Sequence, residues 1–359
     1  MRKGGKRSMC SDTKFLTLSP SIRWVNKCCF LTGRRKTLPP TSQYKEGGMV
    51  LLSRSEVNVF VFFGVLFVVL GILSPNFLDL FNLSNLTRQI SLYAIIAAGE
   101  TMVMTSGGID LSVGSVVALS GVLAAMLNAT GNDYVVISVG IGAGILCGLG
   151  NGLLVSKLRI NPFIVTLGML NIARGVVLVI TKGFPILVYR GLLLTLGQGN
   201  ILEIPILFLF MGVVGMIMAL ILGRTRFGTH LKAIGSNEPA AWAMGINVPR
   251  VKLLTYTLSG LLAGLAGLLL AGRLSAGQAN AGVGWELDAI AAVIIGGTSL
   301  MGGEGSVVGS LVGAALLGVI RNALVLFGVS MYWQTVVIGC ILIGGIALGS
   351  IREIRKVGY

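Results

Sequence analysis

The chain has 359 residues, of which 54% are hydrophobic and 11% are charged, and its mean hydropathy is +0.88. Soluble domains carry about 25% charged residues, so this composition excludes ordinary soluble domains and predicts an all-α, polytopic helical membrane protein. The sequence holds one histidine, His230, which excludes a histidine-based zinc cluster and a Ser-His-Asp triad. We therefore expect no catalytic residues and no metal site on this chain.

The net charge of +15 is concentrated in residues 1–48, which hold eleven Lys or Arg against Asp12 and Glu46. Charge gathered at one end does not indicate a nucleic-acid-binding fold. We interpret 1–48 as a basic extension that either contacts anionic lipid or lies upstream of a start at Met49. Codons for the Lys45–Gly48 stretch can resemble a bacterial ribosome-binding site. Residues 49–359 are expected to form one transmembrane domain.

From Met49 onward, apolar runs alternate with short polar joints. Runs of about 20 residues can cross roughly 30 Å of hydrocarbon as helices. We expect about ten spans, within a range of nine to eleven, with short or broken helices near the Gly-Gly motifs. They are predicted at 57–78, 90–106, 111–132, 134–156, 160–181, 204–223, 253–272, 289–303 and twice within 305–350.

Basic residues in the predicted loops set the orientation, because cytoplasmic loops are enriched in Lys and Arg. With a cytoplasmic N-terminus, the outer loops hold Lys182, Arg190 and Arg273. The inner loops then hold eleven basic residues: Arg54, Lys157, Arg159, Arg224, Arg226, Lys232, Arg250, Lys252, Arg352, Arg355 and Lys356. Both termini are therefore predicted to be cytoplasmic.

Glycines recur every fourth residue in two predicted spans, at Gly140, Gly144, Gly148 and Gly152, and at Gly305, Gly309 and Gly313. This spacing lets helices approach closely in lipid, either within the chain or between two copies. A weak internal similarity also relates 107–117 to 302–308, which is consistent with the repeats of many transporters.

Charged residues inside predicted spans are costly and mark candidate functional positions. One interpretation makes them part of a pathway that hydrogen-bonds a polar solute. The alternative is an ion pair that joins Glu100 or Asp110 to Arg174 or Arg321. Our candidate pathway residues are Glu100, Asp110, Ser112, Asn171, Glu286 and Asp288.

The inner loop 224–250 is predicted to contain a short helix over Pro239–Met244 that lies outside the membrane. Ser236 or Asn237 can cap its start, Pro239 is tolerated in a first turn, and Gly245 favours a stop. The sequence contains no G-x-x-x-x-G-K-[ST] loop, so ATP hydrolysis by that route would belong to another chain.

The pattern Glu238-x-Ala240-Ala241-x-x-x-Gly245 resembles the coupling motif of bacterial ABC importer permeases. Four further segments resemble the ribose/xylose/arabinose-type sugar permeases of this class, and together the matches cover about 57–351. They are Gly107-Gly108-Ile109-Asp110-Leu111-Ser112-Val113-Gly114, Gly235-Ser236-Asn237-Glu238, Glu286-Leu287-Asp288-Ala289-Ile290-Ala291-Ala292-Val293 and Gly296-Gly297-Thr298-Ser299-Leu300.

The resemblance implies a permease in the bacterial plasma (inner) membrane that imports a monosaccharide, with ribose as the first candidate. It implies an ABC ATPase as partner, which carries the ATP and Mg²⁺, so this chain needs no cofactor of its own. It also implies an extracytoplasmic sugar-binding protein and a second permease copy. The ATPase would contact Gly235, Ser236, Asn237, Glu238, Pro239, Ala240, Ala241 and Gly245.

Two other classes remain open on the residues alone. An ion- or proton-coupled secondary transporter would use Glu100 and Asp110 as proton sites, and its transport would collapse with the proton gradient. A membrane scaffold would move no sugar at all. The coupling pattern in the 224–250 loop favours the ATP-driven permease over both.

Overall fold

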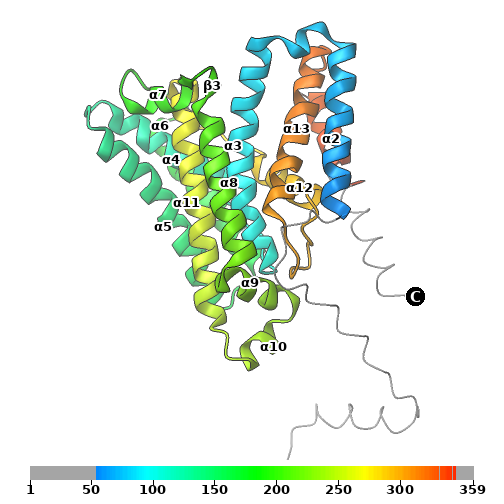
Figure 1. Cartoon of the computed structure of the whole chain (residues 1–359). Coiled ribbons are helices and arrows are strands. Elements are labelled where there is room, and N and C mark those ends of the chain that lie inside the picture. The colour runs from blue at the N-terminus through cyan, green and yellow to red at the C-terminus, as the bar shows by residue number, and fades with distance from the viewer. Residues whose placement is uncertain (1–53, 331, 342, 345–359) are drawn as a thin grey trace, which may run out of the picture. The chain divides into compact units, whose positions relative to one another are not determined.

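The computed structural model describes residues 54–330, 332–341 and 343–344, and its long elements are helices (Figure 1). The basic extension 1–48 lies outside the described residues. The longer helices are α2 (Arg54–Leu73), α3 (Leu80–Thr105), α4 (Val113–Asn128), α5 (Asp133–Ser156), α6 (Pro162–Thr181), α8 (Ile206–Arg224), α11 (Val248–Leu274) and α13 (Val307–Leu326). The shorter ones are η2 (Pro75–Leu78), α7 (Leu192–Gln198), α9 (Arg226–Ser236), α10 (Glu238–Ala243) and α12 (Trp285–Ile295).

Two-residue strands occur only in pairs within the described residues. β1 (Ile186–Leu187) pairs antiparallel with β4 (Ala276–Gly277), and β2 (Asn200–Ile201) pairs antiparallel with β3 (Ile204–Pro205). These strands and α7 belong to the connections that follow α6 and α11. The periodicity of the sequence did not predict them, because two residues are too short for a strand pattern.

Five of the described helices are long and apolar enough to cross a membrane: α5, α6, α8, α11 and α13. Shorter apolar helices occur at Val57–Leu73, Val113–Asn128 and Tyr332–Ile341. Many large apolar side chains on α2, α5, α6 and α8 are exposed, as expected of helices surrounded by lipid. The prediction of an all-α, multi-span architecture is therefore confirmed, whereas the count of ten spans remains a prediction.

The predicted breaks near the Gly-Gly motifs are confirmed. α3 ends at Thr105, and a non-helical stretch precedes α4, so the span predicted at 111–132 contains a helix of 16 residues. The span predicted at 289–303 is shorter still, because α12 has 11 residues and is followed by turns up to Ser306. Gly107, Gly302 and Gly303 all adopt positive φ angles, which non-glycine residues rarely tolerate.

The two glycine ladders face other helices of the same chain. On α5, a Cβ at Gly144 would overlap the backbone of Gly260, and a Cβ at Gly148 would overlap that of Tyr256, so α5 and α11 touch through their backbones. On α13, Gly309 and Gly313 lie against the backbone of α12 in the same way. The ladders therefore pack helices within the chain, which supports the first of the two interpretations.

The two similar segments of the sequence lie against each other. We call Gly107–Gly108, after α3, and Gly302–Gly303, in the α12–α13 connection, the two Gly-Gly turns. They meet, since a Cβ at Gly302 would clash with Gly107. The Gly303 amide donates a hydrogen bond to the Thr105 carbonyl at 3.0 Å. Each turn joins a helix that leads into it to a helix that leads away, so the internal similarity corresponds to two helix–turn–helix units in direct contact.

Candidate functional site

The predicted coupling loop, residues 224–250, contains the short capped helix that the sequence predicted. The Asn237 side chain accepts a hydrogen bond from the Ala240 amide at 3.0 Å and caps α10. At the other end, Gly245 has a φ of +85°, and its amide donates to the Trp242 carbonyl at 2.9 Å. This ending satisfies carbonyls of the last turn, so α10 is capped at both ends despite its length.

The residues of α10 and its C-cap, Met244, divide into a buried group and an exposed group. Ala241 has no exposed surface and packs into the hydrophobic core that includes Leu231 and Val248. Trp242 and Met244 are each 71% exposed. Ala241, expected at the ATPase contact, thus anchors α10 to its own chain. The large apolar side chains of Trp242 and Met244 form the solvent-exposed surface of this region. The motif spacing alone did not identify them.

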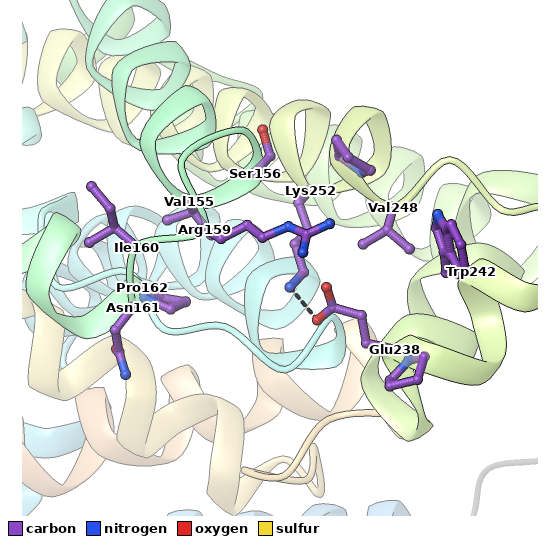
Figure 2. A pocket seen from close by; sticks show the side chains of 12 residues that line it. Val155, Ser156, Arg159, Ile160, Asn161, Pro162, Glu238, Trp242, Val248 and Lys252 are labelled. Carbon is purple, nitrogen blue, oxygen red and sulfur yellow. Dashed lines mark hydrogen bonds and ion pairs between the residues drawn. The ribbon is translucent and has the colours of Figure 1, made fainter. Parts of the chain in front are cut away.

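A cavity of about 620 Å³ opens beside α10. It lies between α10, the start of α11 and the turn that joins α5 to α6, and Trp242, Arg159 and Asn161 are among its lining residues (Figure 2). Within it, Lys252 Nζ and Glu238 Oε2 are 2.6 Å apart. This ion pair joins α10 to α11, although an exposed pair adds little stability.

The coupling loop also contacts both Gly-Gly turns. A Cβ at Gly235, near the end of α9, would overlap the Thr105 carbonyl oxygen and the Gly303 amide nitrogen. A Cβ at Gly303 would in turn meet the Ser236 hydroxyl. The candidate residues Gly235 and Ser236 therefore sit where the ends of α3, α9 and the α12–α13 connection meet, with no side chain between the backbones.

A buried polar cluster lies next to the first Gly-Gly turn. Asp110 Oδ1 accepts hydrogen bonds from the Ser112 amide at 3.0 Å and from the Ser112 hydroxyl at 2.6 Å, and Asp110 Oδ2 accepts from the Ser259 hydroxyl at 2.9 Å. The Asp110 amide donates to Glu100 Oε1 at 3.1 Å, and Asn151 donates to the Ser112 hydroxyl at 2.9 Å. All five residues are buried, so the cluster holds α3, α4, α5 and α11 together.

The predicted ion pair between these carboxylates and Arg174 or Arg321 is wrong. Arg321 Nη2 lies 2.6 Å from both carboxylate oxygens of Asp288, which joins α12 to α13. Arg174 donates to the Ala279 and Ala281 carbonyls. Sequence reasoning identified these charges but not their partners, because partner choice depends on which helix faces pack together.

The remaining pathway candidates bond to groups outside that cluster. Asn171 is exposed on α6 and donates to the Leu167 carbonyl of its own helix at 2.9 Å. Glu286 accepts from the Gly284 amide at 3.3 Å, and a Cβ at Gly114 of α4 would meet its other oxygen. The structure thus divides the six candidates among a buried cluster, an α12 group and one exposed position. Their roles in a pathway stay predictions.

Known proteins resemble this chain over most of its length. Residues 82–345 match the family model described as the permease component of the branched-chain amino acid transport system. A ribose import permease, RbsC of Bacillus subtilis, is 43% identical over 290 residues, which cover 79% of this chain and 89% of that protein. The chain belongs to this permease family. No solved structure matches it significantly.

Other relatives of the family are also sugar permeases. RbsC of Escherichia coli strain K12 is 44% identical over 278 residues, which cover 76% of this chain and 87% of that protein. The L-arabinose permease AraH of the same strain is 35% identical over 302 residues, which cover 84% and 92%. The predicted resemblance to sugar permeases of ABC importers is therefore confirmed. The protein is a multi-pass permease of the inner membrane.

The match to the permease family includes every element described above except α2, η2 and the first residues of α3. The coupling loop, both Gly-Gly turns and the buried cluster fall inside it. The family description names amino acids, whereas the relatives cited here are named for sugars.

Proposed function

We propose that this chain is the membrane-spanning subunit of an ATP-driven, binding-protein-dependent importer of ribose or a similar monosaccharide. The observation that carries the proposal is the way the coupling loop packs against the rest of the chain. Trp242 of α10 and Met244 just after it are exposed to solvent. Gly235, near the end of α9, contacts both Gly-Gly turns. Force applied to α10 by a partner would therefore pass through α9 to the end of α3 and to the α12–α13 connection. The named substrates of the relatives support a sugar.

The proposal includes partners. An ABC ATPase that holds ATP and Mg²⁺ binds the α9–α10 surface, and the chain itself forms no enzyme site. An extracytoplasmic sugar-binding protein delivers the ligand at the opposite end of the helices. A second copy of the permease completes the pathway, and membrane lipid surrounds the pair.

The proposed orientation places α9 and α10 in the cytoplasm, with about ten spans and both termini on that side. The basic residues of the inner loops support it. Arg88, in α3, donates to Asn200 at 2.9 Å and so lies with the outer strands. It raises the outer count of basic residues without removing the excess inside. Helix α11 has 27 residues, or about 40 Å, enough to join the coupling end to the outer end.

Reconstitution tests this function. The permease is placed in liposomes with a candidate ABC ATPase, a candidate extracytoplasmic sugar-binding protein and labelled ribose. We expect uptake that requires ATP and the binding protein and persists when a protonophore removes the proton gradient. Uptake that survives without ATP and stops with the protonophore would instead support a proton-coupled carrier that uses Glu100 and Asp110. No sugar flux with all partners present would support a scaffold.

A further inference from the structure

A second cavity, of about 310 Å³, lies at the opposite end of α11 from the coupling loop. Its walls come from α3, the last turns of α11, the start of α12 and the segment 275–284 that joins α11 to α12. The residues that line it include Gln89, Arg273, Gln278, Asn280 and Trp285. Cavities of about 300 Å³ are at the small end of the range for ligand sites, which suits a solute of monosaccharide size.

The backbone of segment 275–284 is held by β1, α6 and α4, none of which lines this cavity. β4 within it pairs with β1, and the Ser275 carbonyl accepts from the Val188 amide at 2.8 Å. Arg174 of α6 donates to the Ala279 carbonyl at 2.6 Å and to the Ala281 carbonyl at 2.8 Å. A Cβ at Gly282 would overlap the backbone of α4. The segment is therefore fixed by its main chain, with no need of its polar side chains.

Those side chains are free to bind something else. Within the described part of the chain, the side-chain amides of Gln278 and Asn280 make no hydrogen bond, although the main-chain carbonyl of Gln278 accepts from the Ala281 amide at 3.2 Å. Both residues line the 310 Å³ cavity, and both also line a neighbouring cavity of about 530 Å³ beside α6. The segment thus separates two openings and presents the same two amides to each. Unpaired amides on a fixed backbone offer donors and acceptors to a ligand.

The neighbours of these amides suit a neutral polyol. The Trp285 ring packs on Tyr93 with centroids 4.6 Å apart, which fixes it at the edge of the cavity. Arg273 is held by the Asn85 carbonyl, 3.4 Å from its Nη2. Each amide offers a carbonyl acceptor and an NH₂ donor, so two amides can bond neighbouring hydroxyls of one sugar. No acidic residue lines this cavity, so there is no charge partner for a cationic solute.

We propose that Gln278 and Asn280 form a weak monosaccharide-binding site that receives the sugar from the binding protein before it passes between the helices. This rests on the proposed function and adds the residues that contact the sugar. Neither residue was among the candidates drawn from the sequence, because both are uncharged and also lie between the predicted spans 253–272 and 289–303. The signal that existed was a pair of amides in the run of small residues from Ala276 to Gly284.

The test compares the double variant Gln278→Ala/Asn280→Ala with wild type in the reconstituted importer. We expect ribose uptake to fall at least tenfold, while co-purification of the ATPase and ATP hydrolysis without sugar stay within twofold of wild type. Asn76→Ala is the matched control, since Asn76 is an exposed amide in η2 that lines neither cavity. It should import at the wild-type rate.

The isosteric variants Gln278→Glu and Asn280→Asp cover the case in which the alanine variants fail to assemble. They keep the side-chain shape and remove the NH₂ donors, so uptake should again fall by several-fold. Wild-type uptake by assembled variants would overturn the site and leave the proposed function standing. No uptake by the wild-type importer would instead overturn the proposed function.

Discussion

Asp110 accepts three hydrogen bonds in the buried cluster, so its variants separate structure from transport. Asp110→Ala leaves the Ser112 amide and two hydroxyls without their acceptor, at a cost of about 1–3 kcal/mol for each buried group left unpaired. Asp110→Asn keeps a carbonyl oxygen for Ser112, and the Ser259 hydroxyl can turn to accept from the new NH₂. We expect the alanine variant to melt several degrees earlier in detergent and the asparagine variant to show a smaller shift.

Asp133→Asn is the control for the Asp110 variants. Asp133, the half-buried first residue of α5, accepts from the Leu192 amide at 3.1 Å, and asparagine can accept the same bond. Its melting temperature and uptake should match wild type, and Asp110→Asn should impair uptake more. An Asp110→Ala protein that melts with wild type would show that the cluster does not hold the helices together.

Gly245 has a left-handed backbone at the exit of α10, with open space where a Cβ would stand. Gly245→Val would therefore add backbone strain without a clash, at about 1–2 kcal/mol. We expect the chain to insert normally but to lose most ATP-driven uptake, because the end of α10 shifts. Gly223→Ala provides the comparison, since Gly223 lies in α8 with open space and no positive φ. Equal uptake by the two variants would count against a coupling role for the α10 exit.

Helix α10 combines an anchor and a contact surface. Trp242→Ala or Met244→Ala removes an exposed apolar side chain, so the melting temperature should not change. Binding of the ATPase should weaken at least tenfold, as for an interface residue worth about 1.4 kcal/mol or more. Co-purification of the ATPase measures this, with the exposed Tyr134→Ala at the start of α5 as control. Ala241→Asp should act differently and destabilise the permease itself, because Ala241 is fully buried.

Sequence patterns predicted the elements with strong local signals. Apolar runs located the long helices, and Asn237, Pro239 and Gly245 defined α10 with its cap and its exit. The patterns failed where the answer depended on packing. Asp288 was known to be charged, but only the α12–α13 contact assigns it to Arg321. Segment 275–284 was overlooked for a related reason, since its small and neutral residues have no periodicity and no charge.

The basic extension gives a prediction about the complete chain. A protein that begins at Met49 should insert and import sugar as well as the 359-residue chain, because residues 1–48 precede the first predicted span at 57–78. Mass spectrometry of native membranes provides an independent measurement, since peptides from 1–48 should be missing. Their detection, or a loss of uptake on truncation, would assign the extension a role, such as lipid contact.

Three backbones meet without side chains at the junction of Gly107, Gly235 and Gly302–Gly303. A contact between main chains cannot relax by a change of rotamer, so no side chain can absorb a displacement of either backbone. Any displacement of α9 must move the end of α3 and the α12–α13 connection together and by similar amounts. We therefore expect the two helix–turn–helix units to move together. Under the proposed function, one ATPase cycle would then drive one concerted step of the permease.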